Sequence, residues 1–407
     1  MASTTARWNA VSDTAPLDPR PSPGRRDTEI PSPAVQAHAA SLCVLADGSL
    51  TCVWFAGTQE GVPDISIHFS RYNGPGSAPG EEWTVPVKVS EDATRSEQNP
   101  LLVPTPGGEL WLLHTAQLAG HQDTAEVRMR VSRDNGATWG PTRTLFPADE
   151  RGGVFIRQPL VVLDSGRWLL PVFRCTTPPG RPWTGGADTS AVMVSDDEGR
   201  GWREVPVPGS TGRVHMNIEQ LPDRSLLALF RSRSADAVYR SVSTDDGETW
   251  TAPEPTPVPN NNSSVQFRAL ADGRLALIHN HASAADATDR RTNLYDEIED
   301  DAEAMRAAEQ RAARATDREI PEVDAFWGAP RAPLTLSFSH DTGLTWPDRH
   351  DLVTGDGYCL TNDSREGRNR ELSYPSLAQT PDGALHLAYT HHRRAIRHIR
   401  LEAARLE

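Results

Sequence analysis

The sequence predicts an all-β protein, a six-bladed β-propeller with a helical insertion in the fifth blade. Three observations indicate this fold: a corner motif that recurs along the chain, a turn motif upstream of each corner, and a composition that suits a large core. The chain has 407 residues, enough for one large domain or several ordinary ones. Strand repeats of such regular spacing argue against an α/β fold, in which strands alternate with helices.

The composition excludes several classes of protein. Hydrophobic residues make up 37% of the chain, and no run approaches the roughly 18 apolar residues that a membrane-spanning helix needs. The net charge of −14 argues against non-specific nucleic-acid binding, which needs a basic surface. Four cysteines are too few for a disulfide scaffold, so we expect free thiols. Residues 1–10 contain no apolar signal segment, and we therefore expect a cytoplasmic protein.

The corner motif has the form Ser-x-Asp-x-Gly-x-Thr-Trp. In a hairpin corner of this kind, Asp accepts hydrogen bonds from turn amides, Gly adopts positive φ, and Trp packs against a neighbouring sheet. We therefore interpret the motif as structural rather than catalytic. Its copies begin at Ser132, Ser243 and Ser339, with a degenerate copy at Ser195 and a looser one from Ser70 to Trp83.

The turn motif ends a short apolar strand in each of six units. Units of about 50–60 residues that each carry a hairpin signature describe a β-propeller with four-stranded blades. Because the last unit lacks a terminal corner motif, we expect the N-terminal segment to complete its blade. The six turns span residues 45–48, 105–108, 163–166, 221–224, 270–273 and 380–383.

One interval breaks the repeat, because Ser243 and Ser339 are twice as far apart as Ser195 and Ser243. The excess, residues 286–327, carries 13 acidic and 6 basic residues, and residues 296–316 within it are rich in Ala, Glu and Arg. We interpret it as a helical insertion, either a lid or a solvated surface helix. The predicted organisation is an extended lead-in over residues 1–35 and a propeller over residues 36–407.

The innermost strands of a propeller begin around a central funnel, so their first residues converge. Counting back six residues from each turn gives one position per blade, and most of these positions are polar. Strand ends are often polar because they meet solvent, but Arg, Tyr, His and Asn are also the residues of a sugar-binding site. The positions are Ala39 with His38 beside it, Asn99, Arg157, His215, Ser264 and Tyr374.

From about His38 to Ile399, the chain resembles the sialidase superfamily, whose Asp-box repeats are similar to the corner motif. Four stretches are similar to the "predicted neuraminidase" branch of bacteria and fungi. They are Trp54-Phe-Ala-Gly-Thr-Gln-Glu60-Gly, Asn99-Pro100, Ile156-Arg157-Gln158-Pro159 and Ser373-Tyr374-Pro375-Ser376.

The resemblance implies roles for several residues. Tyr374 lies at the position of the sialidase nucleophile, and Asp64 lies near the position of the general acid. Arg331 and either Arg231 or Arg233 lie where sialidases have arginines of the triad that binds the substrate carboxylate, for which the planar guanidinium is suited.

The sequence departs from the sialidase pattern at two positions. His38 replaces the arginine that opens the first inner strand, and Arg157 is a candidate to compensate for it. His215 replaces the glutamate that polarises the nucleophilic tyrosine, and a tyrosine needs a neighbouring base to attack at neutral pH. Asn99 and Gln117 are further candidates to bind sugar hydroxyls.

Three functions remain open on the sequence alone. The first is a sialidase-like exo-glycosidase that cleaves a terminal carboxylated sugar, of sialic acid or uronate type, from an oligosaccharide or glycoside. The second is a uronate lyase in which His38 or Tyr374 removes the proton next to the carboxylate. The third is a non-catalytic sugar-binding propeller. We expect no cofactor, no nucleic-acid partner and no membrane association. We also expect no metal, since no residue spacing resembles a zinc site.

Overall fold

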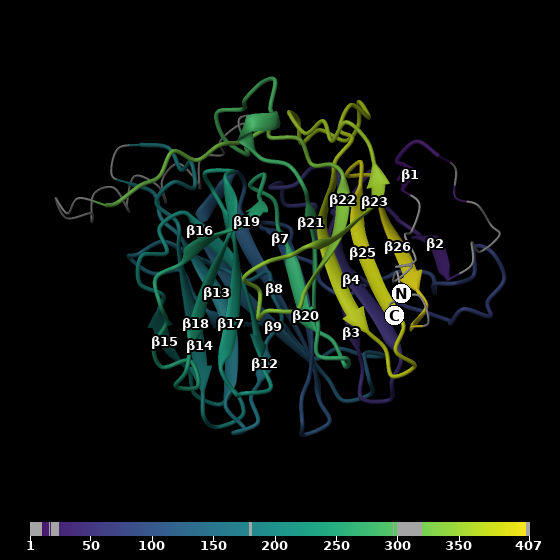
Figure 1. The fold of residues 1–407 in the computed structure, drawn as a ribbon, viewed down its shortest axis with the longest axis horizontal. Helices are drawn as coiled ribbons and strands as arrows, with labels where there is room; N and C mark the ends of the chain where they lie inside the picture. The colour runs from purple at the N-terminus through teal and green to yellow at the C-terminus, as the bar shows by residue number, and fades with distance from the viewer. Residues whose placement is uncertain are drawn as a thin grey trace, which may run out of the picture.

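The computed structural model describes residues 10–15, 17, 24–178, 181–295, 297–298 and 320–403. Their strands form six mainly antiparallel sheets, which are the blades of the propeller (Figure 1). Blade 1 contains β3 (Gln36–Val44), β4 (Leu50–Gly57), β5 (Ser66–Arg71) and β6 (Val87–Lys88). Blade 2 contains β7 (Ser96–Pro104), β8 (Leu110–Leu118), β9 (His121–Ser132) and β10 (Arg143–Phe146). Blade 3 contains β11 (Gly153–Phe155), β12 (Val161–Val162), β13 (Trp168–Cys175), β14 (Thr189–Ser195) and β15 (Arg203–Pro206).

The remaining blades follow the same order, with the innermost strand first. Blade 4 contains β16 (Arg213–Gln220), β17 (Leu226–Ser232), β18 (Ala237–Ser243) and β19 (Glu254–Pro259). Blade 5 contains β20 (Gln266–Ala269), β21 (Leu275–Asn280), β22 (Leu334–Ser339) and β23 (Asp348–Thr354), with β1 (Val11–Ser12) parallel to β23 at its outer edge. Blade 6 contains β24 (Leu372–Gln379), β25 (Leu385–His391), β26 (Ala395–Leu401) and β2 (Arg25–Ile30).

The N-terminal segment completes the last blade, as the repeat count predicts. Strand β2 pairs antiparallel with β26 from Arg25 opposite Leu401 to Ile30 opposite Ile396. Figure 1 shows the two strands side by side at the right of the view. Blade 6 is therefore completed by residues 25–30, which lie far from its other strands in sequence.

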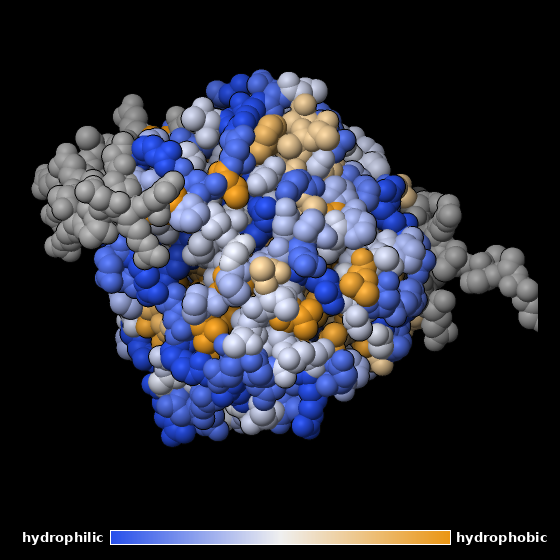
Figure 2. Space-filling model, turned by 60° about the vertical axis from the view of Figure 1, so that its left-hand side comes forward, coloured by the Kyte–Doolittle hydropathy of each residue, from blue (hydrophilic) through white to orange (hydrophobic). Residues whose placement is uncertain are grey.

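The core lies between the blades rather than at one centre. Six clusters of buried apolar side chains each join two neighbouring blades, and a seventh lies beneath the segment that follows β21. Between blades 5 and 6, for example, Leu336 and Phe338 pack with Leu387 and Tyr389. Burial of apolar surface at these interfaces is the main force that closes the ring. The face in Figure 2 is mainly hydrophilic, with hydrophobic residues in small separate spots.

The four corner motifs make the hydrogen bonds expected of structural turns. In the copy that begins at Ser243, the Ser243 hydroxyl accepts the Gly247 N–H at 3.0 Å and donates to Asp245 at 2.8 Å. Asp245 also accepts the Thr249 N–H at 2.9 Å, and Gly247 has a φ of 82°. The Trp250 side chain is buried in the cluster between blades 3 and 4.

The insertion after β21 is only partly described. A single 3-10 turn, Ala284–Asp286, is the only helix in the described residues, and none there is long and apolar enough to cross a membrane. The helical character predicted for residues 296–316 falls almost entirely outside the described residues, so a helical insertion is not shown. The described parts of the insertion run along the upper edge of the view in Figure 1.

The inner strands differ from the sequence expectation in one respect. In four blades the inner strand begins two or three residues before the position found by counting. The residue at the counted position lies at a β-bulge and has a positive φ. A bulge leaves residues out of the ladder and redirects a side chain. The four residues are Ala39 (φ 58°), Asn99 (48°), His215 (54°) and Tyr374 (49°).

Candidate active site

Tyr374 lies at the bulge of β24 and points into the centre of the propeller. The β24–β25 register shifts between Ser373 and Ser376, so Tyr374 is not held by a regular ladder. A tyrosine with a φ of 49° is unusual, because positive φ brings Cβ close to the backbone. Such strain persists where the surroundings hold it in place, often at functional sites. Only 6% of Tyr374 is exposed.

Three arginines surround the Tyr374 ring. The guanidinium carbons of Arg157, Arg231 and Arg331 lie 5.3, 5.7 and 5.7 Å from the ring centroid. Arg231 Nη1 donates a hydrogen bond of 2.7 Å to the Tyr374 hydroxyl oxygen. The structure therefore brings together the predicted nucleophile and all three arginines predicted to bind substrate.

The structure distinguishes Arg231 from Arg233, which the sequence left as alternatives. Arg231 faces Tyr374 and donates to Asn262 at 2.7 Å, and its Nη2 has no hydrogen-bond partner among the described residues. Burial lowers the pKa of Arg231 to about 9. Arg233 instead forms an ion pair with buried Asp188 at 2.6 Å. Arg231 is thus the one available to a ligand in the funnel.

Two histidines flank Tyr374. The ring centroid of His38 lies 4.3 Å from that of Tyr374, and the His215 centroid lies 5.7 Å from it. Burial, reinforced by the surrounding arginines, holds the pKa of both histidines well below the usual range. Each ring has one nitrogen in use: His38 Nδ1 lies 2.8 Å from the Thr390 hydroxyl, and His215 Nε2 lies 3.5 Å from Arg231. The other two, His38 Nε2 and His215 Nδ1, have no hydrogen-bond partner in the described part of the chain.

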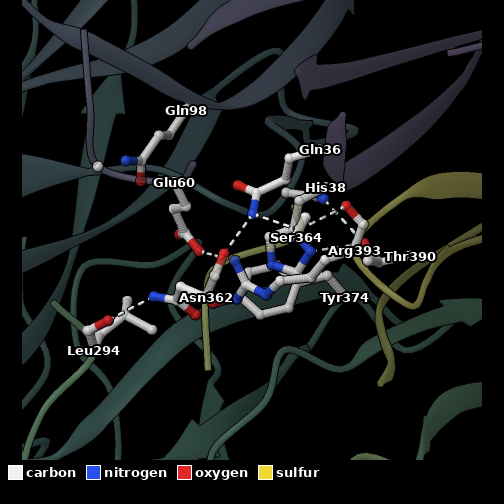
Figure 3. A network of polar contacts seen from close by, with 12 residues as sticks. Gln36, His38, Glu60, Gln98, Leu294, Asn362, Ser364, Tyr374, Thr390 and Arg393 are labelled. Atoms are coloured by element: carbon white, nitrogen blue, oxygen red, sulfur yellow. Dashed lines mark hydrogen bonds and ion pairs between the residues drawn. The ribbon is translucent and has the colours of Figure 1, made fainter. Parts of the chain in front are cut away.

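An ion-pair network on the His38 side of the site was not predicted from the sequence. Glu371 forms ion pairs with both Arg331 and Arg393, and Arg393 also binds Glu60. Figure 3 shows Arg393 and Glu60 in one polar network with His38 and Tyr374. Burial alone would raise the pKa of Glu371, but the two guanidinium groups outweigh it and lower that pKa.

The sequence did carry a partial signal for this network. Arg393 follows the inner hairpin of blade 6, as Arg233 follows that of blade 4. Glu371 precedes Tyr374 by three residues. The blade 4 offsets lead to Thr390 and His392 in blade 6, one residue short of Arg393, and only the fold places Glu60 against Arg393.

Arg157 lies in the gap between β11 and β12, and its guanidinium reaches across the funnel axis. It donates to the backbone carbonyl oxygens of Ala40 at 3.1 Å and Tyr374 at 3.0 Å. These contacts direct its N–H groups to the protein itself. The role in substrate binding predicted for Arg157 stays a prediction.

Of the other predicted residues, Asp64 and Gln117 make their contacts outside the cluster around Tyr374. Asp64 is exposed, and its carboxylate accepts the Thr58 N–H at 3.1 Å. Asn99 is buried at the bulge of β7. Gln117 is buried with its Oε1 3.5 Å from the Tyr295 hydroxyl, and its Nε2 lacks a hydrogen-bond partner among the described residues.

The described parts of the insertion cover one side of the site. Tyr295 accepts a hydrogen bond of 2.9 Å from Gln122, and Trp327 donates one of 2.9 Å to the Thr184 carbonyl oxygen. The Arg231 guanidinium lies 5.6 Å from the centroid of the Trp327 ring. Trp327 is 3% exposed, so the insertion packs closely against the site. Within the described ranges, no group of three or more His, Cys, Asp and Glu side chains is placed to hold a metal ion.

The chain matches a protein family model and is similar in fold to several solved structures. The family model described as the BNR repeat-like domain matches residues 48–387. No curated protein matches the chain in sequence. The solved structure of the Hadza microbial sialidase Hz136 is similar, with a TM-score of 0.63 at 13% identity over 91% of this chain and 66% of that one. The chain thus spans about two thirds of the length of that sialidase.

Two further solved structures show the same likeness. The leech intramolecular trans-sialidase complexed with 2,7-anhydro-Neu5Ac has a TM-score of 0.62 at 14% identity, over 99% of this chain and 71% of that one. A protein of unknown function from Dyadobacter fermentans has a TM-score of 0.63 at 16% identity, over 93% of this chain and 99% of that one. At these identities the likeness shows the fold, a sialidase-like six-bladed propeller.

Proposed function

We propose that the chain, which belongs to the BNR repeat-like domain family, is an exo-acting glycosidase that releases a terminal carboxylated sugar from a glycan. The observation that carries the proposal is the hydrogen bond of 2.7 Å from Arg231 to the hydroxyl of Tyr374. A cationic donor aimed at this oxygen stabilises the negative charge that develops on it when the hydroxyl loses its proton. The proposed nucleophile and the proposed carboxylate-binding group are thus in direct contact.

The balance of charge in the site favours one anionic group on the substrate. Arg331 is paired with Glu371, and Arg393 is paired with Glu371 and Glu60. Arg231 has no carboxylate partner among the described residues and an unpartnered Nη2. A substrate carboxylate beside Arg231 would therefore meet an uncompensated guanidinium, which binds such groups with two parallel hydrogen bonds.

In the proposed reaction, Tyr374 attacks the anomeric carbon as the bond to the leaving oxygen breaks. A neutral imidazole, His215 or His38, accepts the phenolic proton, and Asp64 protonates the leaving oxygen. Water then cleaves the tyrosyl intermediate, and the configuration is retained. A tyrosine nucleophile is a known exception to the usual carboxylate pair. The lowered pKa of both histidines leaves each imidazole neutral near neutral pH, the form that can accept a proton, and also makes each a weaker base than free histidine.

A panel of acidic oligosaccharides, analysed by mass spectrometry, tests the proposal. The panel includes sialyllactose and short oligosaccharides that end in a uronate. We expect wild type to release the terminal acidic sugar with addition of one water, and Tyr374→Phe to lose kcat by at least about 1000-fold. Tyr389→Phe, a buried tyrosine of β25 in the core between blades 5 and 6, is the matched control and should keep its activity. Full activity of Tyr374→Phe would exclude the tyrosine nucleophile.

A uronate lyase is the second candidate, and the His38 geometry favours it. His38 is neutral, its Nε2 has no hydrogen-bond partner in the described residues, and its ring lies against Tyr374. In that reaction His38 removes the proton next to the carboxylate, the resulting electron pair forms a carbon–carbon double bond, and Tyr374 protonates the leaving oxygen. Oligosaccharides that contain a uronate linked through its O4, added to the panel, separate the two reactions, because the unsaturated product of elimination is lighter by one water than the hydrolysis product and absorbs ultraviolet light. Sugar binding without turnover by wild type would indicate a non-catalytic propeller.

A further inference from the structure

Arg157 makes an unusual set of contacts for a residue in a polar funnel. It extends from blade 3 and reaches three other blades, and all its hydrogen-bond acceptors are neutral. Its partners are the carbonyl oxygens of Ala39 (3.3 Å), Ala40 (3.1 Å), Tyr374 (3.0 Å) and Pro375 (3.3 Å) and the hydroxyl of Ser264 (3.3 Å).

The four carbonyl groups belong to the bulges of blades 1 and 6. The β3–β4 register runs from His38 directly to Ser41, and the β24–β25 register runs from Ser373 directly to Ser376. The residues left out of the two ladders are the four that Arg157 contacts. Buried carbonyl groups outside a ladder need donors from elsewhere, because an unpaired polar group is costly in the interior. Arg157 supplies those donors to both bulges at once.

These contacts leave Arg157 poorly suited to bind a substrate carboxylate. The Arg157 guanidinium donates one hydrogen bond from Nε, one from Nη1 and three from Nη2, so its Nη2 already has more acceptors than N–H groups. Burial lowers the pKa of Arg157 to about 10. A substrate carboxylate could accept two parallel hydrogen bonds from this guanidinium only by displacing carbonyl groups bound to Nη2, including that of Tyr374.

We propose that Arg157 is a positioning residue: by binding the carbonyl groups of both bulges it holds Tyr374 in its left-handed conformation and so fixes the Tyr374 hydroxyl beside Arg231. This proposal goes beyond the proposed function, and only its kinetic test rests on that function. The charge of Arg157 matters less than the geometry of its five donors, which lysine cannot reproduce.

The kinetic test compares Arg157→Lys with Arg130→Lys. Arg130 is a matched control because its guanidinium also binds backbone carbonyl groups, those of Val89, Trp139 and Gly140, between blades 1 and 2. On the oligosaccharide that wild type cleaves, we expect Arg157→Lys to lose about 100-fold in kcat with little change in KM, since a misplaced reacting group costs about that much. Arg130→Lys should keep both constants. A large rise in KM with kcat retained would identify Arg157 as a substrate-binding residue and overturn the proposal.

A crystallographic test does not depend on activity. In folded Arg157→Lys we expect Tyr374 to leave positive φ and its hydroxyl to move away from Arg231, whereas an unmoved Tyr374 would overturn the proposal. If wild type cleaves nothing, the proposed function fails and this test still decides the role of Arg157. If Arg157→Lys does not fold, Ser264→Ala removes one acceptor and leaves the arginine in place. In that variant a several-fold fall in kcat supports the proposal, and an unchanged kcat contradicts it.

Discussion

Acidification from about pH 7 to about pH 5.5 should destabilise the protein strongly, because the folded protein buries several histidines in their neutral form. Several histidines are nearly or fully buried with lowered pKa values, His386 among them, and four of these set the minimum effect: His38, His215, His279 and His398. Burial is the main cause in each case. Nearby positive groups add to it, such as the arginines around His38 and His215, and His386 and Arg400 beside His398.

The sign and size follow from proton linkage. The unfolded chain binds a proton at each histidine near its ordinary pKa of about 6.5, whereas the folded chain does not. Each buried neutral histidine therefore makes its full contribution to the free energy of unfolding above about pH 6.5. That contribution decreases as the pH falls toward the pKa of the histidine in the folded protein, which is about 3 for His279. Between about pH 7 and about pH 5.5 each histidine removes about 1 kcal/mol, or about 4–5 kcal/mol for the four. Typical total stabilities are only about 5–15 kcal/mol.

Urea unfolding followed by circular dichroism across this pH range measures the effect. We expect the free energy of unfolding to fall with a limiting slope of at least about four protons, and His279→Gln to reduce that slope by about one proton. His340→Gln, which alters an exposed histidine paired with Asp348, should leave the slope unchanged. A wild-type slope below about one proton would refute the reasoning, since the buried histidines would then be titrating as they do in water.

Two further substitutions test the site network and the corner motif. Glu371→Gln leaves Arg331 buried without a carboxylate partner among the described residues, and should lower the free energy of unfolding in urea by about 3–5 kcal/mol. The control Glu366→Gln alters an exposed pair with Arg368 and should lower it by at most about 1 kcal/mol. Ser243→Ala removes the buried hydroxyl that joins Asp245 to the Gly247 N–H, and should cost about 1–2 kcal/mol, with a similar loss for Ser339→Ala. The prediction for the site network would be contradicted if Glu371→Gln were as stable as wild type and Glu366→Gln. The prediction for the corner motif would be contradicted if Ser243→Ala did not change the free energy of unfolding.

The blades were predictable because their signals are local. Each corner motif fixes its own turn through contacts within eight residues, as Ser243, Asp245 and Gly247 show. Counting the six turn motifs gave the number of blades, and the missing corner motif of the last unit predicted its closure by the N-terminal segment. The bulges were not predictable, because no glycine marks the positive φ of His215 or Tyr374; the tertiary structure holds them in it.

The candidate site was predictable in its centre and not at its edges. The repeat offset found Tyr374, His215 and Arg157, because equivalent positions in a propeller face the same axis. The pairing of Glu60 with Arg393 depends on residues at opposite ends of the chain, and no local pattern reports it. The choice between Arg231 and Arg233 depends on Asp188 in the neighbouring blade, which draws Arg233 away from Tyr374.

The pairing of β2 with β26 has a consequence for how the protein is made. During synthesis the strand Arg25–Ile30 leaves the ribosome before its partner Ala395–Leu401, and strands β3 to β25 are made between them. The first blades can pack while the chain grows, yet the ring stays open until β26 has been made. Contacts between residues so distant in sequence form slowly, because the intervening chain must lose its freedom first. The nascent chain therefore carries an unpaired strand edge until β26 emerges, the kind of surface that molecular chaperones protect.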